Sequence, residues 1–167
     1  MCIRDSVKDL SIQKQLVEYF FKLYEENCHS HTVFFEDMEE TLKQLHQYKK
    51  VILTNKISRF TKKIYKHFQL DQYFLDFYCS DSFEEKKPSG LPIQKISEIY
   101  NVNLSDIIMI GDTMTDINAA KAAKTKNIYV TYGYGQNGDE KNADQFIEHA
   151  SELKGVISWV KTIQNLF

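Results

Sequence analysis

Short runs of apolar, mostly β-branched residues recur along this chain, and each run ends in polar residues or glycine. They are VILT at 51–54, IIMI at 107–110 and NIYVT at 127–131. Continuous apolar runs of this length are typical of strands buried on both faces of a parallel sheet. This pattern is the strongest constraint on the fold, because parallel neighbours must be joined by crossover connections, which are usually helices.

Helical patterns occupy the intervals between these runs, with apolar residues spaced at about 3.6. Helices are predicted at 11–27, 36–49, 58–68, 91–100, 114–124 and from about residue 151. Further strands are predicted at 74–80 and 144–149. Ser58 is the expected N-cap of the third helix. The alternation predicts an α/β fold, a Rossmann-like parallel sheet with helices on both faces.

Composition narrows the functional classes. The chain has 167 residues, 43% apolar and 26% charged, with a net charge of −2. This balance gives no reason to expect nucleic acid or an anionic membrane as a partner, and no apolar run is long enough to span a bilayer. The three cysteines, Cys2, Cys28 and Cys79, form neither a disulfide framework nor a metal-ligand spacing. We therefore expect a cytoplasmic protein with reduced thiols.

Polar residues suited to a phosphate and a metal follow three of the predicted elements. Thr54 and Asn55 follow the run at 51–53, Lys87 precedes a proline, and Asp112 and Asp116 follow the run at 107–110. In parallel sheets, ligands bind beyond the carboxyl ends of the strands. Two carboxylates four residues apart can hold Mg²⁺, one directly and one through water. A hydroxyl and a lysine can bind and neutralise a phosphoryl group.

These segments resemble motifs of the haloacid dehalogenase superfamily, specifically its phosphoglycolate phosphatase-like branch. VILTNK resembles the second motif, KKPSGLP the third and IMIGDTMTDINAAKAAK the fourth. The resemblance implies substrate binding by Thr54, Asn55 and Lys87, catalytic roles for Thr54 and Lys87, and Mg²⁺ binding by Asp112 and Asp116. Gly90 stands where many relatives have a second proline.

The resemblance also implies an activity, namely Mg²⁺-dependent hydrolysis of a phosphomonoester of a small metabolite through a covalent aspartyl-phosphate. Two alternatives remain open: a related phosphotransferase or mutase, and a non-catalytic phosphate-binding relative. A response-regulator receiver is disfavoured, because there the acidic pair precedes the lysine. The sequence identifies neither the particular substrate nor the oligomeric state.

The family's first motif, an Asp-x-Asp segment at the end of the first strand, has no counterpart in this sequence. No two aspartates stand two residues apart, and the nearest pair before residue 35 is Asp5 and Asp9. We therefore interpret 7–35 as the remnant of a small helical cap and 36–167 as a core without its central first strand. The nucleophile and the general acid are then absent, and we predict that this chain is inactive.

The first six residues, MCIRDS, differ in character from the rest of the chain. They contain Arg4, one of only two arginines, the other being Arg59. The DNA ATGTGTATAAGAGACAG, a transposase-end adapter used in sequencing-library preparation, encodes Met-Cys-Ile-Arg-Asp and then begins a Ser or Arg codon. Our hypothesis is that residues 1–6 derive from this adapter.

Overall fold

The structure, a computed structural model, describes residues 9–164 and alternates strands with helices as the apolar runs predict. The strands are β1 (Val51–Leu53), β2 (Asp76–Tyr78), β3 (Ile108–Gly111), β4 (Lys126–Val130) and β5 (Gln145–Ile147). The helices are α2 (Leu10–Asn27), α3 (Met38–Gln44), α4 (Ser58–His67), α5 (Leu91–Tyr100), α6 (Met114–Ala123) and α7 (Leu153–Gln164). No helix of the described residues is long and apolar enough to cross a membrane.

All strand pairings are parallel, but they form two sheets. β1 pairs with β2, and β3, β4 and β5 form a separate sheet in that order. Within residues 9–164, no strand lies between β1 and β3, and these two strands do not pair with each other. This is the α/β architecture predicted from the sequence, and that the core lacks a central first strand stays a prediction with which the two separate sheets agree.

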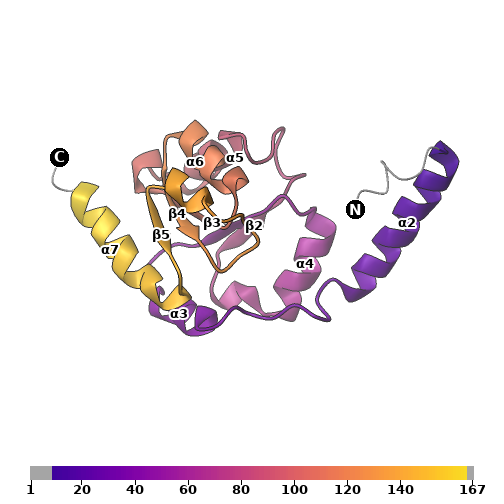
Figure 1. The fold of residues 1–167 in the computed structure, drawn as a ribbon, viewed down its shortest axis with the longest axis horizontal. Helices are drawn as coiled ribbons and strands as arrows, with labels where there is room; N and C mark the ends of the chain where they lie inside the picture. The colour runs from indigo at the N-terminus through magenta and orange to yellow at the C-terminus, as the bar shows by residue number, and fades with distance from the viewer. Residues whose placement is uncertain (1–8, 165–167) are drawn as a thin grey trace.

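Helices cover both faces of the strands (Figure 1). On one face, Ile93 of α5 packs with Ala119 and Ala123 of α6, and Leu53 of β1 and Met109 of β3 lie against this cluster. On the other face, a second buried cluster joins the end of α3 with β4, β5 and α7, through Leu45, Ile128, Val130, Ile147, Leu153 and Ile157. The α5–α6 layer therefore packs against both sheets and holds them in one core.

The two strands next to the missing position are incompletely buried. All three residues of β1 are half-buried, and Ile110 of β3 is 37% exposed. By contrast, the last four residues of β4, which has a neighbour on each side, are buried. The apolar side chains of β1 and β3 are therefore only partly covered by the described residues.

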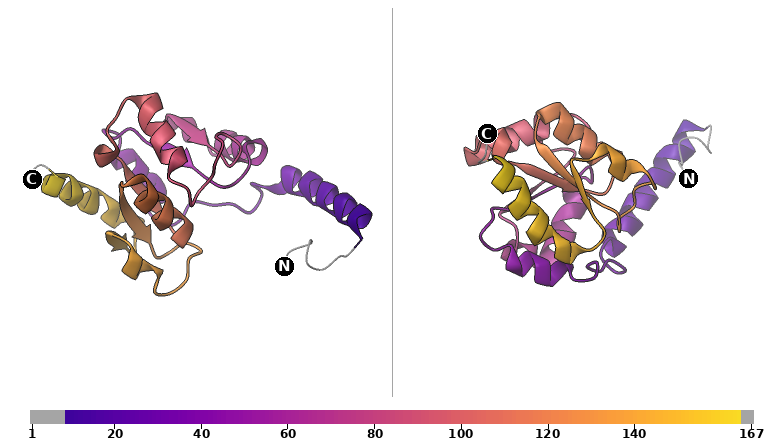
Figure 2. Two further views of the ribbon diagram at one scale, coloured as in Figure 1. Left: turned by 90° about the horizontal axis from the view of Figure 1, so that it is seen from above. Right: turned by 60° about the vertical axis from the view of Figure 1, so that its left-hand side comes forward.

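Helix α2 extends away from the sheets (Figure 2) and has no buried residue. The rings of Phe21 and Tyr24 contact Phe60 of α4 edge-on, and Arg59 of α4 donates a hydrogen bond to Glu25. That contact with Arg59 lowers the pKa of the Glu25 carboxyl. The assignment of 7–35 to a cap stays a prediction, and residues 1–6 lie outside the described residues.

One predicted cap is wrong. Ser58 is the first residue of α4, and Ile57 occupies the N-cap position. The Ser58 N–H and hydroxyl donate instead to the two carboxylate oxygens of Asp81, at 2.9 and 2.6 Å. A side chain 23 residues away therefore stabilises this helix start, which local sequence cannot reveal.

Close packing of α5 on α6 depends on Gly90. A Cβ atom there would lie 2.5 Å from the backbone nitrogen of Ala123 and 2.7 Å from the carbonyl carbon of Ala122. Both are backbone atoms that cannot move aside cheaply. We predict that Gly90→Ala lowers the free energy of unfolding by about 1–3 kcal/mol, the cost of overpacking, in urea denaturation.

The matched control for this prediction is Gly155→Ala in α7, where no atom lies within 4 Å of an added Cβ. This variant is expected to raise stability by up to about 1 kcal/mol through helix propensity. Equal effects of the two substitutions would contradict the packing argument.

Candidate functional site

Thr54 and Asn55 directly follow β1 at its carboxyl end. The Thr54 N–H donates to the carbonyl oxygen of Tyr78 at 2.9 Å, which continues the pairing with β2. The Lys56 N–H donates to Thr54 Oγ1 at 3.1 Å, so the hydroxyl proton of Thr54 remains available to a ligand. Asn55 donates from Nδ2 to the carbonyl oxygen of Lys87 at 2.8 Å and so positions the lysine loop.

Lys87 brings the two sheets together at this edge. Its side chain is buried, and Nζ donates to the carbonyl oxygen of Leu53 at 2.7 Å and to Asp116 Oδ1 at 2.6 Å. The first contact is at the end of β1, and the second is in the first turn of α6, which follows β3. An ammonium group has three donors, so one remains for a ligand.

Asp116 is held from two directions. Its Oδ2 accepts hydrogen bonds from the Thr113 N–H at 3.1 Å and from the Thr113 hydroxyl at 2.8 Å, while Oδ1 accepts from Lys87. Gly111 makes this approach possible, because a Cβ there would lie 2.3 Å from Asp116 Cγ. The buried carboxylate is therefore fixed by a local helix start and by a distant lysine.

Asp112 is positioned by the loop that follows β4. Its Oδ2 accepts a hydrogen bond from the Tyr134 N–H at 2.7 Å, and a Cβ at Gly133 would lie 2.3 Å from the same oxygen. The loop glycines therefore allow backbone to close over Asp112. Sequence analysis gave Gly133 and Tyr134 no role, and the spacing of glycines in VTYGYG was the one available signal.

Two tyrosines near the aspartates were also missed. Burial, followed by the negative charges of Asp139 and Asp112, raises the pKa of Tyr129. Burial and then the Asp112 charge raise the pKa of Tyr132, whose buried hydroxyl has no hydrogen-bond partner in the part of the chain that the structure describes. Both phenols therefore stay neutral beside the aspartates at physiological pH.

The structure thus brings Thr54, Asn55, Lys87 and Asp116 into one connected group, with Asp112 beside it across Gly111. An open hollow of about 670 Å³ lies against Lys87 and is lined by Ser80, Glu84, Glu85, Lys86, Pro88 and Ser89. A free hydroxyl proton and a lysine donor suit an anionic oxygen such as that of a phosphate.

The oxygens of Asp112 and Asp116 are of the chemical type that Mg²⁺ prefers, so these residues fit the ion as part of a ligand set. Asp112 keeps one carboxylate oxygen to which no residue of 9–164 donates, whereas both oxygens of Asp116 are engaged. The described residues contain no cluster of three or more His, Cys, Asp or Glu suited to a metal. Direct coordination would therefore fall to Asp112, with Asp116 acting through water.

We predict that Mg²⁺ binds this chain no more tightly than about 1 mM, the weak end of the range for oxygen-ligand sites. Isothermal titration calorimetry measures this, with Asp106→Asn as the matched control for Asp112→Asn, since Asp106 precedes β3 and Asp112 follows it. A micromolar site that Asp112→Asn removes and Asp106→Asn retains would contradict the prediction.

Known proteins resemble this chain in sequence. The sequence profile of the family described as haloacid dehalogenase-like hydrolase matches residues 2–130. A phosphoglycolate phosphatase of Vibrio parahaemolyticus is 33% identical over 145 residues, which cover 84% of this chain and 64% of that protein. A phosphoglycolate phosphatase of Photobacterium profundum is 30% identical over 157 residues, covering 92% of this chain and 69% of that protein.

Solved structures show the same fold. The crystal structure of a predicted phosphoglycolate phosphatase from Haemophilus somnus superposes with a TM-score of 0.84 at 24% identity, covering 89% of this chain and 68% of that one. A predicted phosphatase from Clostridium acetobutylicum gives a TM-score of 0.77 at 26% identity, covering 90% and 72%. This chain therefore spans roughly two thirds of the length of these proteins.

Proposed function

The chain belongs to the haloacid dehalogenase-like hydrolases, and we propose that it is part of a phosphoglycolate phosphatase-like enzyme. In this proposal the chain carries the residues that bind the phosphate and the metal. In this proposal the complete active site hydrolyses a phosphomonoester of a small metabolite, with Mg²⁺, through an aspartyl-phosphate. The phosphoglycolate phosphatases of Vibrio and Photobacterium support this substrate class.

One observation carries the proposal, namely that Lys87 joins the end of β1 to Asp116 at the carboxyl edge of both sheets. Lys87 is held by two acceptors and keeps a third donor, so its position is fixed before a ligand arrives. Preorganised charge of this kind stabilises the negative charge of a phosphoryl group with little reorganisation. Thr54 donates its hydroxyl proton to a second phosphoryl oxygen.

The acidic residues have a separate task. Asp112 would hold Mg²⁺ directly and Asp116 through water, and the bound ion would offset phosphate charge. Asp116 also orients the Lys87 side chain by accepting its hydrogen bond at 2.6 Å. Tyr134, through its backbone N–H, fixes the rotation of the Asp112 carboxylate.

In this proposal the residues of the chain bind phosphate and Mg²⁺, but none of them is the nucleophile, since the sequence contains no Asp-x-Asp pair. We predict that the purified chain does not hydrolyse phosphoglycolate in the presence of Mg²⁺. Loss of a nucleophile from a hydrolase triad lowers kcat by on the order of 10⁶, and we expect a similar scale. Phosphate release that rises in proportion to the protein and disappears on Lys87→Ala would contradict this.

A chimera tests the proposed function itself. The segment of the Vibrio parahaemolyticus enzyme that precedes its match to this chain is fused ahead of Val7, and we predict Mg²⁺-dependent hydrolysis of phosphoglycolate. In the chimera, Asp112→Asn lowers kcat/KM by on the order of 10² or more, the scale of losing one preorganised electrostatic contact.

The matched control is Asp106→Asn, at the opposite end of β3, which leaves kcat/KM within about twofold of the parent chimera. A folded chimera without activity on phosphoglycolate or other small phosphomonoesters would overturn the proposed function. Equal losses from the two substitutions would overturn the role of Asp112.

A further inference from the structure

A second cavity lies near the amino end of β1, whereas the candidate site lies beyond its carboxyl end. It has a volume of about 450 Å³ and is lined by residues of α3, of the segment before β1 and of the segment before β2. Lys50 of this cavity directly precedes β1, whereas Thr54 directly follows it. At about 3.3 Å per residue in a strand, the two positions are separated by roughly 13 Å, so the cavity is distinct from the phosphate site.

Among residues 9–164, no carboxylate pairs with the charge of Lys50. Its Nζ donates to the carbonyl oxygens of Leu45 at 2.6 Å and Tyr48 at 3.3 Å, and among the described residues no carboxylate lies within ion-pair distance of it. Burial lowers the pKa of this ammonium group. Two neutral acceptors leave one of its three donors open, and a partly buried cation without a counter-ion favours an incoming anion.

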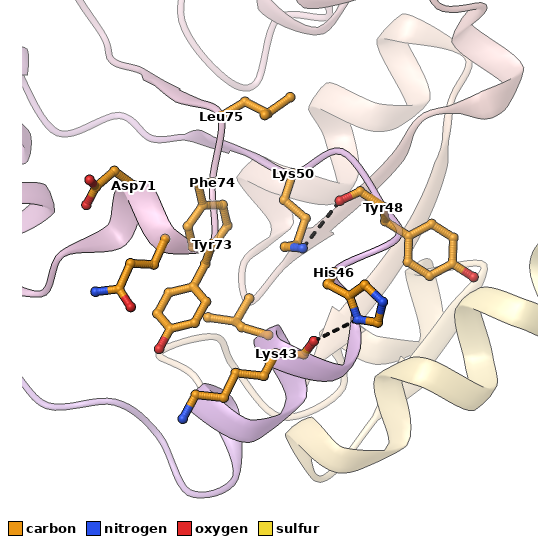
Figure 3. A pocket seen from close by; sticks show the side chains of 10 residues that line it. Lys43, His46, Tyr48, Lys50, Asp71, Tyr73, Phe74 and Leu75 are labelled. Atoms are coloured by element: carbon orange, nitrogen blue, oxygen red, sulfur yellow. Dashed lines mark hydrogen bonds between the residues drawn. The ribbon is translucent and has the colours of Figure 1, made fainter.

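The other charged residues of the cavity do not fill this role. Lys43 is paired with Glu39 at 3.0 Å, and Tyr73 donates its hydroxyl to the same carboxylate at 3.0 Å. His46 Nδ1 lies 3.2 Å from the Lys43 carbonyl oxygen. In Figure 3, Asp71 lies beyond Phe74 as seen from Lys50, and its carboxylate points away from the ammonium group.

The walls of the cavity are partly apolar. In Figure 3 the Lys50 side chain lies across the space from the rings of Phe74 and Tyr73, and Leu42 also lines it. A volume of this size falls in the range of small-molecule sites, which combine apolar walls with a few fixed polar groups. One open ammonium donor beside aromatic rings suits a single carboxylate on an apolar body better than a compact, multiply charged anion.

We propose that this cavity binds a small organic carboxylate, whose anionic group pairs with Lys50 and whose apolar body lies against Phe74 and Leu42. The site is independent of the proposed phosphatase function, because it shares no residue with the group around Lys87.

Benzoate is the probe, added to the ¹⁵N-labelled full chain while the amide signals are followed by NMR. The expected dissociation constant is on the order of 1–10 mM, reasonable for a ligand of this size. The amide shifts should fall in residues 42–50 and 71–75. Shifts confined to residues 54–56, 87 and 112–116 would overturn the proposal, since they would place the anion at the phosphate site.

Variants and ligand analogues test separately the ion pair with Lys50 and the apolar contact with the cavity wall. Lys50→Gln retains an amide donor for the neighbouring carbonyls but removes the charge, and it should weaken benzoate binding at least about tenfold, the scale of one charge-assisted hydrogen bond. Lys49→Gln, at the exposed neighbouring position, should leave binding unchanged. Acetate, without the ring, and benzyl alcohol, without the charge, should each bind at least about tenfold more weakly than benzoate.

Unchanged benzoate binding in Lys50→Gln, or equal binding of benzyl alcohol, would overturn the proposal. If Lys50→Gln fails to fold, nuclear Overhauser contacts between benzoate and the Phe74 ring in the unaltered chain decide the matter. Their presence supports the site, and their absence at saturating benzoate contradicts it.

Discussion

The buried ion pair between Lys87 and Asp116 is the interaction on which the rest of this structure depends. The described strands form two sheets that share no backbone pairing, so their common edge must be held by side chains. Lys87 reaches the last carbonyl of β1 and the first turn of α6 at once. The apolar layer of α5 and α6 adds a non-directional contact to both sheets, whereas the ion pair sets which atoms face each other.

A buried ion pair is costly to desolvate, and its value lies more in geometry than in net stability. Here that geometry is also the geometry of the phosphate site. The ammonium group that connects the sheets is the group proposed to meet the phosphoryl oxygens, and the carboxylate that orients it belongs to the proposed metal ligands. One pair therefore has both a structural and a proposed chemical role, and the hydroxyl proton of Thr54, which the Lys56 contact leaves available, lies beside it.

Much of the fold could be predicted from the sequence, because strands buried on both faces leave continuous apolar runs and the intervening helices keep their periodicity. That the polar residues after β1 and β3 come together could be predicted for a related reason, since parallel strands end at the same edge; their roles stay a prediction. Contacts across long sequence distances could not. Asp81 stabilises the start of α4, and the Tyr134 backbone fixes Asp112; neither contact has a local pattern. The cavity at Lys50 could not be predicted, because most lysines are exposed to solvent and nothing in the local sequence shows that Lys50 Nζ donates to two backbone carbonyl oxygens.

A double-mutant cycle on Lys87→Met and Asp116→Asn tests most directly whether this pair joins the two sheets. The free energies of unfolding of the parent, both single variants and the double variant are measured by urea denaturation. Each single change should cost about 3–5 kcal/mol, because it leaves the other partner buried without its counter-charge. The double variant should lose less than the sum of the single losses, by about 1–3 kcal/mol of coupling. Additive losses, within about 0.5 kcal/mol, would contradict the account.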